Sequence, residues 1–533
     1  MKIALAQINT ANGDLQGNDR KIRKFLDSAK QQSPSLVIFP ELALVGYPPK
    51  DFLFQHQFVN QAKSLVAKLA TDYRDMNFLI GSAEQHANVL YYVSGGKIQN
   101  VFQKNLLPNY DVFDERRYFQ PGKDVLHIQL ENKKIGITIC EDIWFEDSQS
   151  YDRNPVDQFQ NQNIDVLINI SASPFQLGKF VHRKEIVAGH AKHLKVPVVY
   201  VNLVGGNDEL LFDGGSFVMN KQGEIIHQLP FFTESLSNFD FQNSEPIVIE
   251  AGSDTDQLIA AITMGLKDFV RKCGFRDVVL GLSGGIDSAL VLLLAIEAFG
   301  KDHVHPIFLP SQFTSSMSKE DVRNIVDQLA IPLSMIPINE IVKSYVDVME
   351  SSLDSKLKKI TLENLQARTR GALLMACSSE RNAVVIGTGN KSELATGYAT
   401  LYGDLIGAVS PLGDLYKHQV YAMTEKLNQK YQAIPRRVFD RAPSAELSEN
   451  QKDSDQLPEY DILDAVVKSY IEDQKSEQDL IHQGVSKKVL ETVIPMFINS
   501  EFKRKQAPPV LRVSSKAFGV GRRMPIARKS YEI

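Results

Sequence analysis

The segment 277–299, DVVLGLSGGIDSALVLLLAIEAF, limits what this chain can fold into more than any other part of the sequence. It is apolar enough to suggest a membrane span, but Ser283, Gly284, Gly285 and Asp287 interrupt it well before about 18 apolar residues accumulate. A buried strand, a glycine turn and a buried helix explain the pattern better. The glycines let the backbone approach a phosphate closely, and the start of the helix offers free N–H groups and a positive dipole end. The segment therefore predicts an anion-binding loop in an α/β domain.

The rest of the chain repeats the alternation of β-rich and helical stretches in two series. Helical periodicity appears at 18–32 and 58–73, between runs of Val, Ile and Leu that are typical of strands covered on both faces. The predicted strands are 2–7, 35–40, 77–83, 134–140, 165–171, 196–202 and 215–220, then 277–283, 303–309, 331–338 and 382–389. The segment 231–256 has no sustained period, and we interpret it as the connection between domains 1–245 and 246–533.

Composition excludes several classes of protein. Hydrophobic residues make up 43% and charged residues 23%, which is typical of globular chains, and a net charge of -5 argues against a protein that coats nucleic acid. The three cysteines form no CxxC pair, so a disulfide framework, a zinc finger and an iron–sulfur cluster are unsupported. Gln7 and Asn9 break the apolar N-terminal run, which therefore lacks a signal-peptide core. We expect a cytoplasmic protein that binds neither nucleic acid nor membrane.

Three residues that follow apolar runs form a second pattern. Cys140 ends KIGITIC, Glu41 follows SLVIF in FPEL, and Lys104 stands in VFQKNLLP. The spacings, 63 residues from Glu41 to Lys104 and 36 from Lys104 to Cys140, place the three on separate strands, whose ends an α/β sheet can bring together. Glu41 can take the thiol proton if burial raises its pKa, and a cationic Lys104 would favour the thiolate and the oxyanion formed at an amide carbonyl. A lone cysteine, however, is more often a small buried hydrophobic residue.

The ordered set FPEL, KxxLP and CEDIW resembles the carbon–nitrogen hydrolase (nitrilase) superfamily. The resemblance implies an αββα sandwich and a triad of Glu41, Lys104 and Cys140 that cleaves amides through a thioester, with Glu115 as a supporting second glutamate. In the glutaminase members, the positions of Tyr110, Ser173 and Lys179 hold the L-glutamine substrate. For Tyr110 the alternative is a packed aromatic residue.

The glycine loop SGGIDS has neither the Lys-Ser/Thr pair of a Walker A loop nor the spacing GxGxxG. It resembles the pyrophosphatase-loop ATP enzymes, which have a Rossmann-like parallel α/β domain and split ATP between its α and β phosphates. The resemblance implies ATP binding along one continuous segment, with Asp287 as the Mg²⁺ ligand that assists pyrophosphate departure. The residues of that segment are Gly281, Leu282, Ser283, Gly284, Gly285, Ile286, Asp287 and Ser288.

Three further motifs, ENLQARTRG (363–371), GTGNKSELATGYATLYGD (387–404) and EFKRKQAPP (501–509), resemble NAD synthetase. The resemblance assigns Thr388 to ATP, Asn364 and Lys503 to deamido-NAD, and Glu393 to magnesium or deamido-NAD. Gln366 stands where the family commonly has lysine, so any phosphate contact there is neutral. The segment 311–321 resembles a mobile loop that closes over ATP. Arg368 and Arg370 fit a phosphate clamp or a solvated helix face.

Together the motifs cover nearly the whole chain in the order of the glutamine-dependent NAD synthetases. This implies a homo-oligomeric ligase with ATP as co-substrate, Mg²⁺ as cofactor, and L-glutamine and deamido-NAD as the other substrates. Ammonia released from glutamine would displace AMP from an acyl-adenylate, and a tunnel is expected because free ammonia is mostly protonated in the cytosol.

Two alternatives remain. The first is another glutamine-dependent adenylating amidotransferase. The second is a tRNA-modifying or RNA-binding pyrophosphatase-loop protein that uses the basic tail, where residues 501–533 hold nine Lys or Arg against two Glu.

Overall fold

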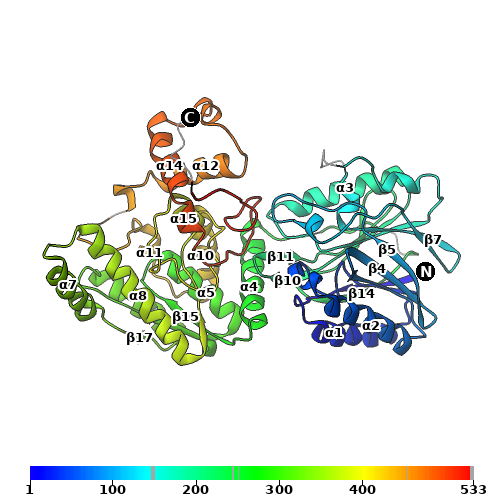
Figure 1. Ribbon diagram of the computed structural model, residues 1–533, viewed down its shortest axis with the longest axis horizontal. Helices are drawn as coiled ribbons and strands as arrows, with labels where there is room; N and C mark the ends of the chain where they lie inside the picture. The colour runs from blue at the N-terminus through cyan, green and yellow to red at the C-terminus, as the bar shows by residue number, and fades with distance from the viewer. Residues whose placement is uncertain (146–150, 243–244, 250, 450, 452, 528–533) are drawn as a thin grey trace. The chain divides into compact units, whose positions relative to one another are not determined.

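Figure 1 shows the computed structural model of the chain, which describes residues 1–145, 151–242, 245–249, 251–449, 451 and 453–527. The chain divides into two compact units, Met1–Gly252 and Ser253–Ile533. In the described residues, no helix is long and apolar enough to cross a membrane.

The first unit contains two six-stranded sheets. One has the order β14 (Ser235–Asp240), β1 (Lys2–Gln7), β2 (Leu36–Ile38), β3 (Phe78–Glu84), β4 (Ala87–Ser94) and β5 (Lys97–Gln103). The other has the order β13 (Ile225–Gln228), β12 (Phe217–Met219), β9 (Val198–Asn202), β8 (Val166–Ser171), β7 (Lys133–Ile139) and β6 (His127–Leu130). A separate hairpin pairs β10 (Val204–Asn207) with β11 (Leu210–Asp213).

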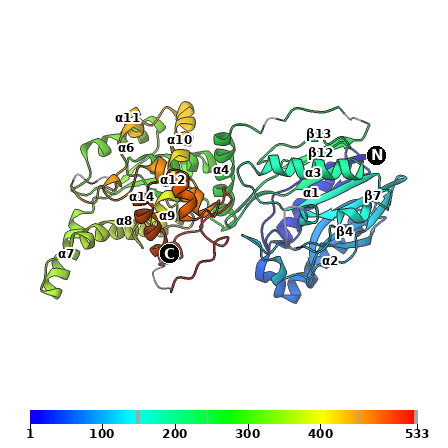
Figure 2. The same ribbon diagram turned by 90° about the horizontal axis from the view of Figure 1, so that it is seen from above.

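The alternation of side chains along the strands explains why these sheets stack. Ile3 and Leu5 of β1 belong to the apolar core shared with Ile137 and Ile168 of the second sheet. The outer face of the first sheet packs against α1 (Leu15–Lys30) and α2 (His56–Asp72). The outer face of the second sheet packs against α3 (Lys179–Leu194), which lies along β12 in Figure 2. The αββα sandwich expected for this unit is confirmed.

The prediction for 231–256 was wrong in part, because Ser235–Asp240 forms β14 and pairs antiparallel with β1. Only Phe239 of this strand is buried, so the sequence lacks the apolar run that would have revealed it. The bounds of β5, the strand before Lys104, were not predicted for the same reason, since only Phe102 of its seven residues is buried. Edge strands of this kind are fixed by backbone pairing rather than by side-chain burial.

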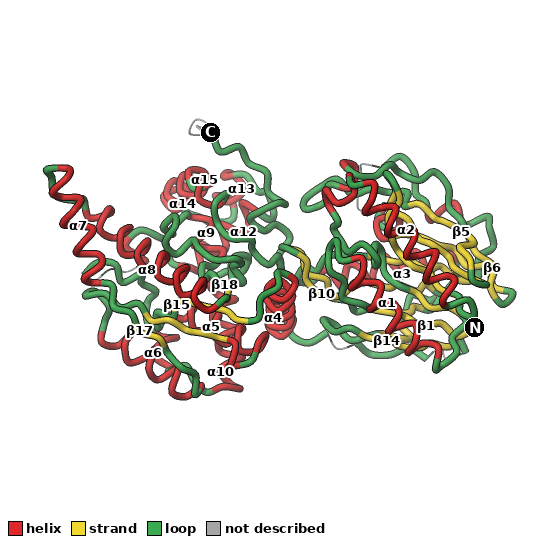
Figure 3. Tube along the Cα trace, turned by 60° about the horizontal axis from the view of Figure 1, so that its bottom comes forward, coloured by secondary structure: helices red, strands yellow, loops and turns green. Residues whose placement is uncertain are grey.

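The second unit is built on a four-stranded parallel sheet of the order β17 (Ser334–Met335), β16 (Val304–Phe308), β15 (Asp277–Gly281) and β18 (Ala383–Val385). Helix α8 (Lys359–Arg381) covers one face, where Leu374 packs with Val279 and Val385. Helix α5 (Ile286–Phe299) contacts β15 and β16 and packs with α4 (Asp254–Lys272) and α10 (Lys417–Tyr431). Figure 3 shows this arrangement of strands between helices. The Rossmann-like parallel α/β architecture is confirmed.

The remaining helices complete the second unit. α6 (Ser316–Leu329) and α7 (Asn339–Leu353) precede α8, and α11 (Arg436–Asp440) follows α10. A helical group shares its own apolar core: α9 (Lys391–Thr396), α12 (Tyr460–Ile471), α13 (Glu477–His482) and α14 (Lys487–Asn499), followed by the short α15 (Glu501–Arg504). The predicted closing loop 311–321 is helical from Ser316 on, because the Ser315 side chain caps α6 by accepting from the backbone N–H of Ser318.

Candidate active sites

The structure brings Glu41, Lys104 and Cys140 together from two different sheets. Glu41 follows β2 and Lys104 follows β5 in the first sheet, whereas Cys140 follows β7 in the second. The sequence prediction placed Cys140 at the end of its strand. Instead, Ile139 ends β7, and Cys140 begins the 3-10 helix η3 (Cys140–Ile143) with a φ of 45°. This left-handed conformation is costly for a residue with a side chain, and such strain is typical of functional sites.

The Lys104 ammonium group lies between two carboxylates. Its Nζ is 2.7 Å from Oε1 of Glu41 and 2.8 Å from Oε1 of Glu115, and the Lys104 side chain is fully buried. Glu41 is held further by Asn88, whose Nδ2 donates to Oε1 at 2.7 Å, and by the N–H of Ala172, which donates to Oε2 at 2.8 Å. The buried Lys104 and Glu41 charges are therefore paired with each other and further hydrogen-bonded.

Burial and charge set the protonation of this site. Burial raises the pKa of the Cys140 thiol well above its usual range, and the Glu41 carboxylate adds to this while Lys104 opposes it. Burial alone would lower the pKa of Lys104, but Glu115 and Glu41 outweigh it and raise that pKa. Burial raises the pKa of Glu115 to about 7, against the pull of Lys104. The resting site thus combines a neutral thiol with a permanent cation, and a base is needed to form the thiolate.

Tyr110, one of the predicted glutamine-binding residues, contacts Glu141, which sequence reasoning missed. Oε1 of Glu141 accepts from the hydroxyl groups of Tyr110 at 3.0 Å and of Tyr151 at 2.9 Å. Its only sequence signal is its place directly after Cys140 in CEDIW.

Two further predicted residues are placed by their surroundings. Nζ of Lys179 donates to the backbone oxygen of Pro174 and lies 5.4 Å from the ring centre of Trp144. Ser173 is buried, and its N–H donates to Oδ1 of Asn202 at 2.9 Å. Both residues lie in the stretch between β8 and the first turn of α3.

The predicted phosphate loop connects β15 to α5 in the second unit. Ser283 and Ser288 close the loop on itself, since their hydroxyl oxygens are 3.1 Å apart and the N–H of Ser283 donates to Oγ of Ser288. Gly284 has a φ of 86°, and a Cβ there would lie 2.9 Å from the backbone oxygen of Ser318. Glycine is therefore required at this turn, and the N-terminus of α5 remains directed toward the loop.

Asp287 and Glu393, the predicted metal ligands, lie on either side of Lys417. Nζ of Lys417 is 2.5 Å from Oδ2 of Asp287 and 3.9 Å from Oε1 of Glu393, and Nδ2 of Asn390 donates to Oδ1 of Asp287. Burial and the Asp287 carboxylate raise the pKa of Glu393 to about 8, although Lys417 opposes them. The space beside the Asp287 and Glu393 carboxylates therefore favours a bound cation in addition to Lys417.

The pair fits Mg²⁺, which takes one or two carboxylates together with substrate phosphates. No group of three or more His, Cys, Asp or Glu in the described parts of the chain could hold a metal ion alone. Asp287 and Glu393 would therefore hold Mg²⁺ jointly with the phosphates of a nucleotide.

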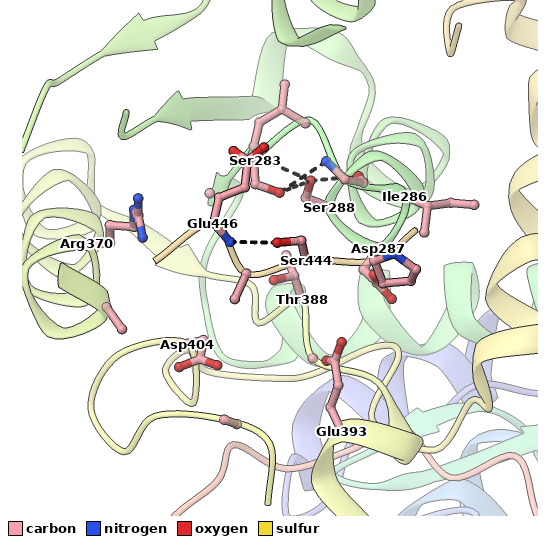
Figure 4. Close-up of a pocket in the computed structure, with 18 of the residues that line it drawn as sticks. Ser283, Ile286, Asp287, Ser288, Arg370, Thr388, Glu393, Asp404, Ser444 and Glu446 are labelled. Carbon is pink, nitrogen blue, oxygen red and sulfur yellow. Dashed lines mark hydrogen bonds between the residues drawn. The ribbon is translucent and has the colours of Figure 1, made fainter. Parts of the chain in front are cut away.

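These residues line a cavity of about 330 Å³ within the second unit. In the view of Figure 4, Ser283 and Ser288 lie on one side, Glu393 and Asp404 on the other, and Thr388 between them. The volume suits a drug-sized or nucleotide-sized ligand. The cavity thus unites the loop, Thr388 and the candidate metal ligands.

Comparison with known proteins decides the family. The Carbon-nitrogen hydrolase model matches residues 2–245, and the NAD synthase model matches residues 258–507. The glutamine-dependent NAD(+) synthetase of Synechocystis is 39% identical over 99% of this chain and 98% of its own length. The chain belongs to the glutamine-dependent NAD(+) synthetases.

Other members of the family support this assignment. The glutamine-dependent NAD(+) synthetase of Thermotoga maritima is 37% identical and is matched over 100% of this chain and 99% of its own length. The structure of the Acinetobacter baumannii glutamine-dependent NAD+ synthetase in complex with adenosine diphosphate has a TM-score of 0.78 and 37% identity, covering 98% of each chain. The enzyme of Cytophaga hutchinsonii, at 19% identity and a TM-score of 0.85, covers 99% of this chain and supports the fold alone.

In this glutamine-dependent NAD(+) synthetase chain, two predicted deamido-NAD residues meet at the turn after α9 rather than in the lining of the cavity. Nζ of Lys503 donates to the backbone oxygens of Gly397 and Ala399 at 2.7 and 2.8 Å. Oδ1 of Asn364 accepts from Oγ1 of Thr400 at 3.0 Å. The same turn contributes Ala399 to the cavity wall, so Lys503 and Asn364 border the cavity from outside.

Arg370 and Arg368 differ in their surroundings. Arg370 lines the cavity, and its Nε donates to the backbone oxygen of Leu309. Arg368 donates to the backbone oxygen of Leu401 and is more exposed. Of the two, only Arg370 has the position required of a phosphate clamp.

Two residues over the phosphate loop were not foreseen from the sequence. NH2 of Arg441 donates to the backbone oxygen of Gly284 at 2.8 Å, and Oε1 of Glu446 accepts from Oγ of Ser318. They belong to the segment that follows α11 and lines the cavity. The stretch RAPSAEL carries no spacing that links it to the glycine loop, so only the tertiary fold reveals the contact.

The basic tail is largely engaged within its own unit. The Arg504 guanidinium donates to the backbone oxygens of Leu394 and Ala395, and Arg522 forms an ion pair with Glu501 at 2.5 Å. Arg512 donates to the backbone oxygen of Ser515. Arg528 and Lys529 lie outside the described residues. These contacts give the tail a structural role that does not require RNA.

Proposed function

We propose that this protein makes NAD from deamido-NAD, ATP and L-glutamine in the cytoplasm. The first unit hydrolyses glutamine to glutamate and ammonia. The second unit joins the nicotinate carboxylate of deamido-NAD to AMP, releasing pyrophosphate, and ammonia then displaces AMP. Membership in the family supports the overall reaction, and the two site geometries support the division of labour.

In the first reaction, Glu41 takes the proton of the Cys140 thiol as sulfur attacks the glutamine amide carbonyl. Lys104, kept cationic by its two carboxylate partners, stabilises the oxyanion. The same Glu41 carboxyl then gives its proton to the departing amide nitrogen, which leaves as ammonia, and water cleaves the thioester to give glutamate. Tyr110, Ser173 and Lys179 hold the amino-acid end of glutamine, together with Glu141, whose carboxylate suits the α-ammonium group.

In the second reaction, residues 281–288 and Thr388 bind ATP so that the deamido-NAD carboxylate reaches the α-phosphate. Mg²⁺ bound by Asp287 and Glu393 would neutralise charge on the departing pyrophosphate. Asn364 and Lys503 act from the border of the cavity on deamido-NAD. Lys417, which contacts Asp287, reduces the repulsion between the site and its polyanionic ligands.

The observation that carries the proposal is the buried Glu41–Lys104–Glu115 cluster beside Cys140 in a chain whose other unit holds a nucleotide-sized cavity at a phosphate loop. The test is product analysis with deamido-NAD, ATP, Mg²⁺ and either glutamine or ammonium. NAD should form with both nitrogen donors, and glutamate only with glutamine. Formation of neither NAD nor glutamate would overturn the proposal.

ATP cleavage should yield AMP and pyrophosphate in equal amounts with NAD. The loop lacks the lysine with which a Walker loop holds the γ-phosphate, and its glycines let backbone N–H groups approach the phosphates. Separation of the nucleotides by chromatography, with a pyrophosphate assay, measures this ratio. ADP as the stoichiometric product would contradict the assignment of the loop.

Lys503→Ala should raise the KM for deamido-NAD about tenfold with ammonium as the nitrogen donor, because a charged hydrogen-bonding group is lost at the turn that borders the cavity. The KM for ATP and the rate of glutamine hydrolysis should change little. Steady-state kinetics with each substrate varied in turn measures these constants, and Lys505→Ala, which changes an exposed lysine two residues on, is the matched control. An unchanged KM and kcat for deamido-NAD would remove Lys503 from the site.

The protein acts as a homo-oligomer in this proposal. Helix α7 has no buried residue and exposes apolar side chains, among them Val348 at 66% and Leu353 at 59%. Such a face is typical of a contact surface. Light scattering measures the molar mass, and a monomer at assay concentrations would contradict the oligomer.

A further inference from the structure

The carboxylate of Asp142 joins the segment that bears Lys104 to the segment that bears Cys140. Its Oδ1 accepts the backbone N–H groups of Asn105 at 2.9 Å and Leu106 at 2.8 Å, directly after Lys104. Its Oδ2 accepts the N–H of Ile139 at 3.0 Å, directly before Cys140. Asp142 is only 2% exposed, so these three N–H donors replace water as partners of its carboxylate.

This link crosses the sandwich. Asn105 and Leu106 leave β5 of the first sheet, whereas Ile139 and Asp142 belong to the end of β7 and to η3 in the second. The apolar core between the sheets sets their separation but allows small sliding motions, since dispersion contacts are not directional. Hydrogen bonds to one carboxylate are directional, so they can fix the two segments in register.

The same carboxylate acts on the strained backbone of the nucleophile. Cys140 has a φ of 45°. Asp142, two residues after Cys140, accepts the N–H of Ile139, the residue directly before Cys140. A conformation of this kind persists only where its surroundings hold it in place. Without the Ile139 bond, the turn could relax and move the sulfur.

We propose that Asp142 is a positioning residue that fixes the Cys140 sulfur against the Lys104 ammonium for formation of the thioester. It touches neither glutamine nor the reacting atoms. Its effect should therefore appear in the rate of sulfur attack and hardly in glutamine binding. This role rests on the thiol chemistry proposed above for Cys140.

Asp142→Asn tests the role with little change in shape. Both oxygens of Asp142 face N–H donors, so an amide must turn its NH₂ group toward one of them, which loses a hydrogen bond and adds repulsion. A displacement of about 1 Å at a reacting group can cost about 100-fold in rate. We expect the limiting rate of Cys140 alkylation by a chloroketone analogue of glutamine to fall about 100-fold. The analogue concentration at half-maximal rate should change little.

Active-site titration with the same analogue separates positioning from folding. The proposal expects one labelled Cys140 per chain in Asp142→Asn, at the reduced rate. A purely structural role would instead lower the labelled fraction and leave the remaining sites at the rate of the unchanged protein, and that result would overturn the proposal. An unchanged rate with full labelling would also overturn it.

Three further variants complete the experiment. Asp165→Asn alters a carboxylate that accepts the N–H of Lys134 at the other end of β7 and should leave the alkylation rate unchanged. If Asp142→Asn yields no folded protein, Asp142→Glu replaces it, because glutamate keeps the charge but displaces it. Slow, complete labelling of Cys140 is then expected. Slow but incomplete labelling, or labelling at the unchanged rate, counts against the role of Asp142. Wild-type labelling that Cys140→Ala abolishes tests the proposed function itself, so its failure is distinguishable from failure of the Asp142 role.

Discussion

Cys140→Ala should abolish glutamine-supported NAD synthesis, by at least about 1,000-fold, and leave ammonium-supported synthesis at its original rate. Alanine cannot form the thioester, whereas the second unit receives ammonia in either case. The cysteine is 7% exposed and packs among apolar side chains of the inter-sheet core, so a methyl group in its place keeps most of these contacts. The loss should therefore be chemical rather than structural.

The measurement is NAD formation with saturating glutamine or ammonium, together with glutamate release. Cys273→Ala is the matched control because Cys273 is an exposed cysteine of the second unit. It should behave like the unchanged protein with both donors. Equal loss with glutamine and ammonium in Cys140→Ala would contradict the assignment of two separate sites.

Asp287→Asn should lower NAD synthesis with both nitrogen donors by about 100-fold or more, because the adenylation step precedes any use of ammonia. The change keeps the shape of the side chain but removes one of the two charges that would bind Mg²⁺. It also leaves Lys417 beside an uncharged amide, so one buried cation loses its nearest counter-charge.

Pyrophosphate release at varied Mg²⁺ measures the effect, and a larger requirement for Mg²⁺ is part of the expected result. Asp277→Asn is the control, since Asp277 lies at the opposite end of β15 and contacts His305 outside the cavity. Glutamate release from glutamine alone should persist in Asp287→Asn. A defect confined to glutamine-supported synthesis would exclude Asp287 from the adenylation site.

The parts of the fold that the sequence predicted are those whose buried positions carry apolar residues in a continuous or periodic run. β1 was predicted at its observed bounds because Ile3 and Leu5 face one apolar core while Ala4 and Ala6 face another. The bounds of β14 and β5 were not predicted, because most of their side chains are exposed or half-buried. Such strands are fixed by backbone pairing with another strand, and the periodicity of their own residues does not reveal that partner.

The candidate sites divide in a similar way. Residues within a compact motif, such as 281–288, were predicted together because a loop and the helix after it are continuous in sequence. Glu115 was predicted only from the family resemblance. Its contact with Lys104 through both carboxylate oxygens appears only in the fold. Lys417 and Arg441 were missed because nothing in their local sequence distinguishes a surface cation from one folded against the phosphate loop.

The pairing of β1 with β14 has a consequence for how the chain is made. β1 is synthesised before the other strands of the first unit, yet its antiparallel partner, from Ser235 opposite Gln7 to Asp240 opposite Lys2, comes at the end of that unit. During translation, one edge of β1 therefore stays unpaired while almost the entire unit is synthesised, at about 5–20 residues per second. An open edge is prone to pair with other chains during that interval. Once β14 closes it, the glutamine-hydrolysing body can be complete before the phosphate loop has even been translated.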